Sequence, residues 1–472
     1  MKLSLDNEDT MADKYEMMNT GNLHKALAWL AAPAIVGLIV QTLYGIIDSV
    51  FIGRGLGDDG VLGLAALAVA FPLSYLLMCV GSGVAVGGSS FISRGFGAAD
   101  KERVQKGIGN MILMALAMSV FCTIFGLLFL TPLLTLFGAT ATNMPFAHDY
   151  MFWIILGCVF QIMTLTLNTV VMAQGNAVYS MTMYVTSSLV NVVLDYVFIF
   201  EFGWGVQGAA IATVLSQMLN VVILIFYLYK VSKLNFSLKW IRFDRPAFSE
   251  IGKIGISEFL REGSLIFMFI ITVWNINYYG DDTHIAIYGL INRIFGFVFI
   301  PAIGIVQGMI PLAGFNYGAK NYERVRKIVR ISLVWSIGLL FVLTAITYIF
   351  TAEIFTLFIP QSPDLIQEAV IAYWIADVMV PLIAIQVIGS AFMQAVGKAK
   401  ASFVLAVARQ GIMIPIMLLV PYLMGLVGVW VAYPISDFLA SLLTLLFVVS
   451  QMKSLKKEER LLEKYKREGS PV

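Results

Sequence analysis

Two polar side chains interrupt an otherwise apolar stretch between Tyr184 and Phe200. Asn191 and Asp195 are four residues apart, so a helix places both on one face, with Ser187 one turn earlier. An ionised side chain at membrane depth costs roughly 2.5–3.5 kcal/mol on insertion scales. Asp195 therefore needs a cation, a proton or a wet cavity beside it, and such groups are typical of ion and substrate pathways.

The composition places this stretch in a bilayer. Of the 472 residues, 59% are hydrophobic and only 13% are charged, whereas a soluble domain has about 25% charged residues. The three cysteines all fall in apolar runs, which argues against a disulfide framework. The polar start of the chain and the long apolar run after it predict no cleavable signal peptide. We expect an integral membrane protein that binds no nucleic acid.

Hydropathy predicts an all-α polytopic membrane protein with about twelve transmembrane helices. A crossing takes about 20 apolar residues as a helix. The apolar runs are continuous rather than alternating, which excludes membrane-spanning strands. The expected spans lie near residues 27–53, 61–90, 104–130, 145–173, 177–200, 206–230, 249–279, 284–312, 322–350, 366–396, 401–424 and 426–451.

Lysine and arginine gather in alternate loops. If the N-terminus is cytoplasmic, the even loops and the tail carry nearly all of them, and the opposite side has Arg54 beside acidic loops. The basic positions cluster at 94–106, 230–253, 320–330, 398–400 and 453–467. Because short cytoplasmic loops are rich in Lys and Arg, this pattern predicts that both termini are cytoplasmic.

The chain repeats itself. Gly97–Lys106 reads GAADKERVQK, and Gly318–Lys327, about half a chain later, reads GAKNYERVRK. A weaker echo joins residues 205–212 to 425–432 at nearly the same offset. Six helices in each half is an even number, so the halves share one orientation. Two such lobes related by a parallel repeat are a transporter architecture.

These boundaries divide the chain into five parts. We expect a cytoplasmic N-terminal segment, a six-helix lobe, a cytoplasmic linker, a second six-helix lobe and a basic cytoplasmic tail. They cover residues 1–26, 27–230, 231–248, 249–451 and 452–472.

Three segments resemble the multidrug and toxic compound extrusion (MATE) transporters. Gln41–Gly53 is similar to the first helix of the family, Met172–Asn176 to the end of the fourth, and Pro311–Ala319 to the segment after the eighth. The resemblance covers nearly the whole chain. It implies two six-helix lobes arranged as a V, which export amphipathic organic molecules as Na⁺ or H⁺ enters.

The resemblance also implies a site. In one branch of the family a cation or a proton binds inside the N-terminal lobe, and the first helix bends at a proline that matches Pro33. The residues that match its binding motif are Asp48, Asn168, Asn191, Asp195 and Thr213. Another branch uses a Glu in helix seven and an Asp in helix ten. Glu258, Glu262 and Asp377 lie in those helices, but not at that branch's positions.

The residues themselves support the N-terminal site. Asp48 and Asp195 have no Lys or Arg with them in the spans of this lobe. Two carboxylates close together at low dielectric cannot both stay ionised, so a proton or a cation must join them. Asn168, Asn191 and Thr213 add neutral oxygens, which suit an alkali ion or a proton relay. The alternative is a pair of permanently protonated carboxyls that hold helices together.

The C-terminal lobe mixes both signs of charge. Opposite charges at membrane depth usually neutralise each other, so we expect an ion-pair network here rather than a second cation site. The alternative is that these groups line the cavity and bind charged substrates. The candidates for the network or the cavity are Gln41, Tyr44, Glu258, Arg261, Glu262, Arg293, Asp377 and Arg409.

The preferred hypothesis is a cation-coupled exporter of amphipathic organic compounds in a bacterial cytoplasmic (inner) membrane. It would be a monomer, would not be an enzyme, and would need no cofactor or metal besides Na⁺ or H⁺. The alternative is a flippase or an exporter of one lipid-linked or metabolite substrate. A membrane enzyme would need a catalytic cluster, and none is evident. An ATP-driven pump would need a nucleotide-binding domain, and the chain has none.

Overall fold

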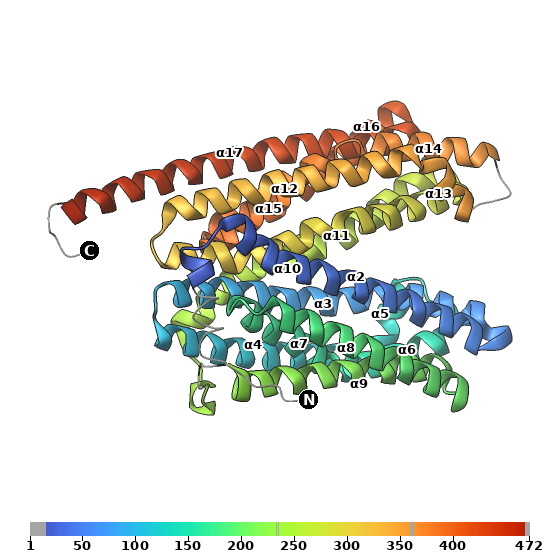
Figure 1. The fold of residues 1–472 in the computed structure, drawn as a ribbon. Coiled ribbons are helices and arrows are strands. Elements are labelled where there is room, and N and C mark those ends of the chain that lie inside the picture. The colour runs from blue at the N-terminus through green and yellow to red at the C-terminus, as the bar shows by residue number, and fades with distance from the viewer. Residues whose placement is uncertain (1–15, 233, 235, 359–362, 468–472) are drawn as a thin grey trace.

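The computed structural model describes residues 16–232, 234, 236–358 and 363–467, and within these residues it is helical without strands (Figure 1). The helices of the first half are α2 (Leu23–Gly55), α3 (Gly60–Gly97), α4 (Lys101–Leu128), α5 (Leu130–Leu136), α6 (Met144–Leu156), α7 (Cys158–Ala173), α8 (Ala177–Tyr196) and α9 (Gly205–Phe226). Those of the second half are α10 (Arg245–Tyr279), α11 (Asp282–Gly318), α12 (Tyr322–Ile349), α13 (Thr351–Phe358), α14 (Pro363–Asp377), α15 (Val380–Ala395), α16 (Ala399–Met424) and α17 (Leu426–Arg467). The predicted all-α, two-lobe class is confirmed.

Most of these helices can cross a bilayer. In the described chain, 10 helices are long and apolar enough, or 11 if the bent pair α6 and α7 counts as one span. Helix α10 has 35 residues, which is also long enough, but Glu258, Arg261 and Glu262 near its middle lower its hydropathy. With α10 the described chain has the expected twelve spans.

One predicted span is not a single helix. Residues 145–173 form α6 and α7, which meet at Gly157 with a bend of 48°. A side chain on Gly157 would overlap Val214 of α9, so the close approach of α9 requires glycine at the bend. The corresponding span of the second half also breaks, between Asp377 and Val380. Hydropathy cannot detect a bend that leaves the segment apolar throughout.

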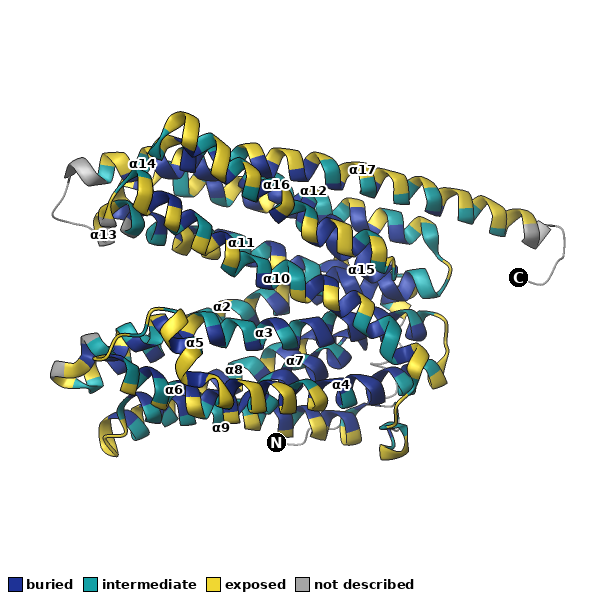
Figure 2. Ribbon diagram, turned by 180° about the vertical axis from the view of Figure 1, so that it is seen from behind, coloured by how far each residue is buried: buried dark blue, intermediate teal, exposed yellow. Residues whose placement is uncertain are grey.

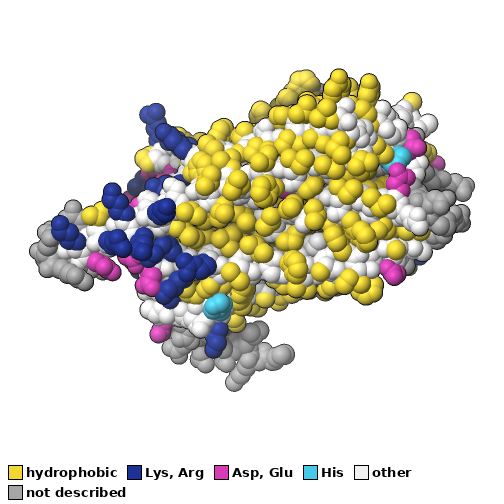
Figure 3. All heavy atoms as spheres, turned by 90° about the horizontal axis from the view of Figure 1, so that it is seen from above, with side chains coloured by type: hydrophobic (Ala, Val, Ile, Leu, Met, Phe, Trp, Pro, Cys, Tyr) yellow, Lys and Arg dark blue, Asp and Glu magenta, His cyan; other side chains and the backbone are white. Residues whose placement is uncertain are grey.

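Charged side chains gather at the two ends of the molecule. Figure 3 shows a broad apolar surface with Lys and Arg concentrated at one end, here called the basic end, and acidic side chains at both ends. The basic end carries the starts of α4 and α12 and the projecting last turns of α17 (Figure 1). An apolar surface between two charged ends is what a bilayer requires.

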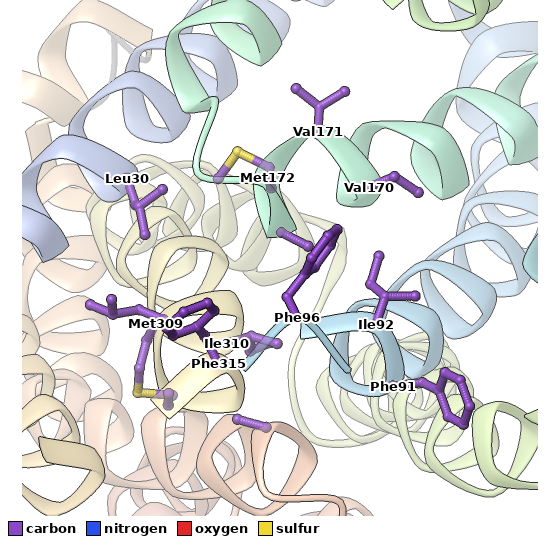
Figure 4. Close-up of a cluster of buried hydrophobic side chains, with 14 of the residues drawn as sticks. Leu30, Phe91, Ile92, Phe96, Val170, Val171, Met172, Met309, Ile310 and Phe315 are labelled. Atoms are coloured by element: carbon purple, nitrogen blue, oxygen red, sulfur yellow. The ribbon is translucent and has the colours of Figure 1, made fainter. Parts of the chain in front are cut away.

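The two lobes meet at the basic end and diverge away from it (Figure 2). At the basic end a single apolar core joins both lobes, and it includes Leu30 and Phe91 of the first lobe and Met309 and Phe315 of the second (Figure 4). Farther away each lobe has its own core, with members such as Leu134 in one and Phe355 in the other. The molecule is therefore a V closed at the basic end.

The sequence repeat is also a structural repeat. Ala99 and Lys320 occupy equivalent positions of the two copies, and both have left-handed backbone conformations, with φ of 55° and 57°. In the next helical turns, the ion pairs Lys106–Glu102 and Lys327–Glu323 measure 2.9 and 2.6 Å. Left-handed backbone is rare outside glycine, so the two halves share the local fold in detail.

Candidate functional site

Five helices of the first lobe, α2, α3, α7, α8 and α9, line a cavity of about 380 Å³. Helix α2 contributes Pro33, Gln41 and Tyr44, α8 contributes Asn191, and α9 contributes Thr213. The cavity also reaches the second lobe, where its lining includes residues of α10 and α11. Predicted site residues that are far apart in sequence thus line one space.

Asp48 and Asp195 lie just behind this lining. Asp48 is 7% exposed and Asp195 is fully buried, with Asn191 one turn before it on α8 at 2%. Both carboxylate oxygens of Asp195, Oδ1 of Asp48, both polar atoms of Asn191 and Oδ1 of Asn168 are buried without a hydrogen-bond partner in the described structure. Buried polar atoms are nearly always paired, so this cluster points to a ligand.

The charges of Asp48 and Asp195 are close enough to interact, and Tyr44 and Tyr150 are close to both. Among the described residues, no Lys, Arg or His forms an ion pair with either carboxylate. A hard cation would find carboxylate and amide oxygens here, the ligands that such ions prefer. A proton shared between the carboxylates would also relieve their repulsion. The donor set therefore fits either Na⁺ or H⁺.

The sequence of α8 explains why its polar side chains lie together. Its buried polar face carries Ser180, Ser187, Ser188, Asn191 and Asp195, which follow helical spacing. Directly after Asp195 the chain widens into a π-helical stretch, Val197–Glu201. Such stretches are frequent at functional sites.

Thr213 of α9 lines this cavity, whereas Asn168 of α7 lines a second, smaller cavity. Asn168 donates to the hydroxyl of Tyr184 at 3.4 Å, which leaves its own oxygen unpaired. Thr213 lines the cavity and is half-buried. Pro33 lies inside α2, well before Asp48 on the same helix, and also lines the cavity.

A second, smaller cavity of about 170 Å³ lies between the lobes and contains a charged cluster. Arg261 bonds Glu258 at 2.6 and 2.9 Å and Glu262 at 2.5 Å. Glu258 also accepts from Gln394 at 2.8 Å, and Glu262 accepts from Tyr75 of the first lobe at 2.6 Å. Glu262 lines both cavities, so the polar space is shared across the lobes.

Farther into the second lobe, Arg409 donates to Asp437 at 3.3 Å, and Gln386 donates to the backbone carbonyl of Asp437 at 3.0 Å. The other two predicted members of the network are not brought into it. Asp377 is buried near Asp437 but has no ion pair, and Arg293 is exposed without one in the described structure.

Several residues of these sites were missed by sequence reasoning. Tyr75 and Gln394 complete the charged cluster, and Tyr150 approaches both N-lobe carboxylates. None of the three is unusual in an apolar helix, since a tyrosine or a glutamine there is common. Asp437 lies within the apolar run 426–451, and a carboxylate in such a run is the sequence signal that could have indicated a partner such as Arg409.

The comparisons agree with this architecture. The MatE family model matches residues 33–197 and 263–419. The multidrug export protein MepA of Staphylococcus aureus strain MSSA476 is 26% identical over 425 residues, which cover 90% of this chain and 93% of that protein.

Solved structures resemble it over nearly the whole length. One described as the outward-facing conformation of a multidrug resistance MATE family transporter is 24% identical, with a TM-score of 0.88 over 94% of this chain and 98% of that one. A transporter from Pyrococcus furiosus, whose description mentions reverse polarity of its binding pocket, is 25% identical, with a TM-score of 0.87 over 94% and 98%. With its two matched halves and its V of two six-helix lobes, this chain is a member of the MatE family of transporters.

Proposed function

We propose that this protein is an antiporter that exports amphipathic organic compounds while Na⁺ or H⁺ enters through the first lobe. The observation that supports this most is the group of unpartnered oxygens on Asp48, Asn191 and Asp195. Asn191 of this group lines a cavity that also reaches the other lobe. An ion bound here can therefore affect the surface that meets the exported compound.

Coupling requires that the ion and the compound favour different arrangements of the lobes. A cation or proton between Asp48 and Asp195 relieves their repulsion and lets α2 repack about Pro33. Because Pro33, Gln41 and Tyr44 line the cavity, this repacking narrows it and weakens binding of the compound. One charge moving down about 100 mV supplies about 2.3 kcal/mol, enough for a roughly fifty-fold gradient of the compound.

The V is consistent with export as the direction of transport. We place the basic end in the cytoplasm of a bacterium, because cytoplasmic loops collect Lys and Arg. The lobes then diverge towards the outside, where a compound would be released and an ion would enter. The protein would work as a monomer, since each chain contains both lobes and both cavities.

A flippase for a lipid-linked diphosphate has less support. Such a substrate needs several free cations in the cavity. Arg261 is held by two glutamates and Arg409 by Asp437. Only Arg293 among the three candidates lacks such a partner in the described structure, and one arginine is a weak diphosphate site.

The test is an equilibrium titration of a fluorescent cationic dye, followed by fluorescence polarisation, at rising Na⁺ and, separately, at falling pH. In the wild type the coupling ion should weaken dye binding at least five-fold. In Asp48→Asn, Asp195→Asn protein, dye affinity should no longer respond, because neutral amides neither release a proton nor balance a cation. Asp149→Asn removes an exposed carboxylate of the same lobe and should behave as wild type. Independent binding, or mutual strengthening of dye and ion, would exclude this mechanism.

A further inference from the structure

At the basic end each lobe holds the first helix of the other. Helix α2 starts the first lobe but packs against α11 and α12 of the second, and α10 starts the second lobe but packs against α3 and α4 of the first. At the basic end, equivalent helices therefore pack across the lobes while each also packs within its own lobe, α2 against α8 and α10 against α16. At the far end the lobes have separate cores.

The start of α10 is fastened to the first lobe by charge. Glu250 accepts from Arg94 of α3 at 2.6 Å and from Arg103 of α4 at 3.0 and 3.1 Å. The side chain of Arg94 is only 11% exposed. The guanidinium carbon of Arg103 lies 4.2 Å from the centre of the Phe91 ring. Charge-assisted bonds to a carboxylate are about twice as strong as neutral ones.

The caps of α10 and α4 hold these groups in place. Asp244 caps α10 by accepting from Ala247 at 3.1 Å, and its own backbone N–H donates to the side chain of Asn110 on α4 at 3.0 Å. Asp100 caps α4 by accepting from the backbone N–H of Arg103 at 2.9 Å. Glu250 and Arg103 thus face each other from fixed helix starts.

The start of α2 is fastened to the second lobe by the repeat partner of Arg103. That partner is Arg324, which donates to the backbone carbonyls of Met18 at 3.2 Å and Gly21 at 3.0 Å. It also donates to the side chain of Asn316 at 3.0 Å, which in turn donates to Met18 at 3.0 Å. Met18 is buried, so this segment belongs to the closed end rather than to its surface.

Between these two contacts the helices α3 and α11 cross without side chains between them. A Cβ on Gly97 would overlap the carbonyl oxygen of Phe315, and one on Gly318 would overlap that of Arg94. Gly97 and Gly318 are themselves repeat partners. No path for a solute passes through such a contact, so the basic end opens only if the groups across it separate.

We propose that Arg103 and Arg324, with their acceptors, are the gate of the basic end and must release before that end can open. Here "gate" means these two arginines, the acceptors Glu250 and Asn316, the backbone carbonyls of Met18 and Gly21, and Arg94, which also donates to Glu250. This rests on the proposed function, because only alternating access requires the end to open. The two halves of the gate differ in chemistry. One is an ion pair across the lobes, and the other is a set of bonds to backbone carbonyls.

The test measures the distance between spin labels on a background in which the three cysteines are alanine. Labels replace Tyr229 and Lys400, exposed residues of the two lobes at the basic end, and, in a second pair, Thr140 and Thr283 at the other end. Glu250→Gln should raise the ratio of open to closed basic ends about ten-fold, which corresponds to about 1.4 kcal/mol. The far-end pair should move closer in the same molecules.

The matched control is Glu323→Gln, which removes an ion pair of similar length that stays inside α12. It should leave both distances unchanged. Arg324→Gln should act like Glu250→Gln, and Glu250→Asp, which keeps the charge, should shift the ratio less. A distance distribution for Glu250→Gln equal to that of Glu323→Gln would overturn the gate.

Transport measured on the same variants separates the two proposals. If no ion drives export but Glu250→Gln still opens the basic end, the gate stands and the antiport function is wrong. If ion-driven export is intact in wild type and Glu250→Gln moves neither label pair, the gate is wrong and the function stands.

Discussion

The interiors of the two lobes treat buried charge in opposite ways. In the first lobe Asp48 and Asp195 face each other without a basic partner in the described structure. In the second lobe Asp437 is held by Arg409 and Gln386, although the nearby Asp377 is buried without an ion pair in the described structure. A carboxylate with a built-in cation is fixed, whereas one without is free to exchange a cation or a proton. The exchange that we propose therefore belongs to the first lobe, whereas the Arg409–Asp437 pair supports the second.

The strongest test of this difference is Asp195→Asn. We expect gradient-driven export to fall at least a hundred-fold, because the amide keeps the shape but cannot exchange a proton or balance a cation. The thermal stability of the purified protein should not fall, since the change removes an unpaired buried carboxylate. Dye efflux from proteoliposomes under imposed Na⁺ or H⁺ gradients checks the first expectation. Normal export in this variant would show that Asp195 is not needed for ion exchange and that the first lobe does not differ from the second in this role.

The opposite pattern is expected for Arg409→Leu. Removing one partner leaves Asp437 buried and unpaired, so the free energy of unfolding should fall by about 3 kcal/mol, near the low end for such pairs because Arg409 is 29% exposed. Unfolding in detergent micelles measures this loss. If stability is unchanged while ion coupling disappears, the second lobe also holds an exchange site.

The double change Arg409→Leu, Asp437→Leu sharpens this result. Replacing both charges with apolar side chains is often close to neutral, so we expect all but about 1 kcal/mol of the lost stability to return. Export should remain ion-coupled. A double variant as unstable as Arg409→Leu would mean that Asp437 has a structural role beyond the pair.

The smallest expected effect tests the loop that is repeated in both lobes, at Ala99 and Lys320. Ala99 and Lys320 occupy left-handed backbone, which costs a residue with a Cβ about 1–2 kcal/mol. Ala99→Gly and Lys320→Gly should therefore each stabilise the protein by about 0.5–1 kcal/mol. Ala98→Gly, at a residue with φ of −80°, is the control and should not stabilise it. Unequal effects of Ala99→Gly and Lys320→Gly would show that the loops are alike only in shape.

Much of the fold could be predicted because membranes impose simple rules. Span length, loop charge and the internal repeat together predicted two lobes of six helices. The bend at Gly157 could not be predicted, since it depends on how closely α9 approaches. The span 249–279 could be predicted despite the charges near the middle of α10, because apolar residues lie on both sides of them.

The candidate site was partly predictable for a similar reason. A carboxylate such as Asp195 stands out in an apolar helix, and the resemblance supplied its partners. Which carboxylates lack a counter-ion depends on distances between helices, so the contrast between Asp195 and Asp437 needed coordinates. The gate was invisible because Arg94 and Arg103 were read as ordinary topology signals, and a pairing with Glu250 across the lobes leaves no sequence pattern.

The crossing at Gly97 and Gly318 lies at one extreme of two very long helices. At 1.5 Å per residue, the 38 residues of α3 extend about 57 Å from that point. While the basic end stays closed, a rotation of about 10° around the crossing would move the distant tip by about 10 Å. Until the gate releases, the two lobes can therefore tilt only about this crossing. A methyl group added at Gly97 or Gly318 would change the angle at which α3 and α11 cross, and the resulting displacement would be largest at the far ends of these helices.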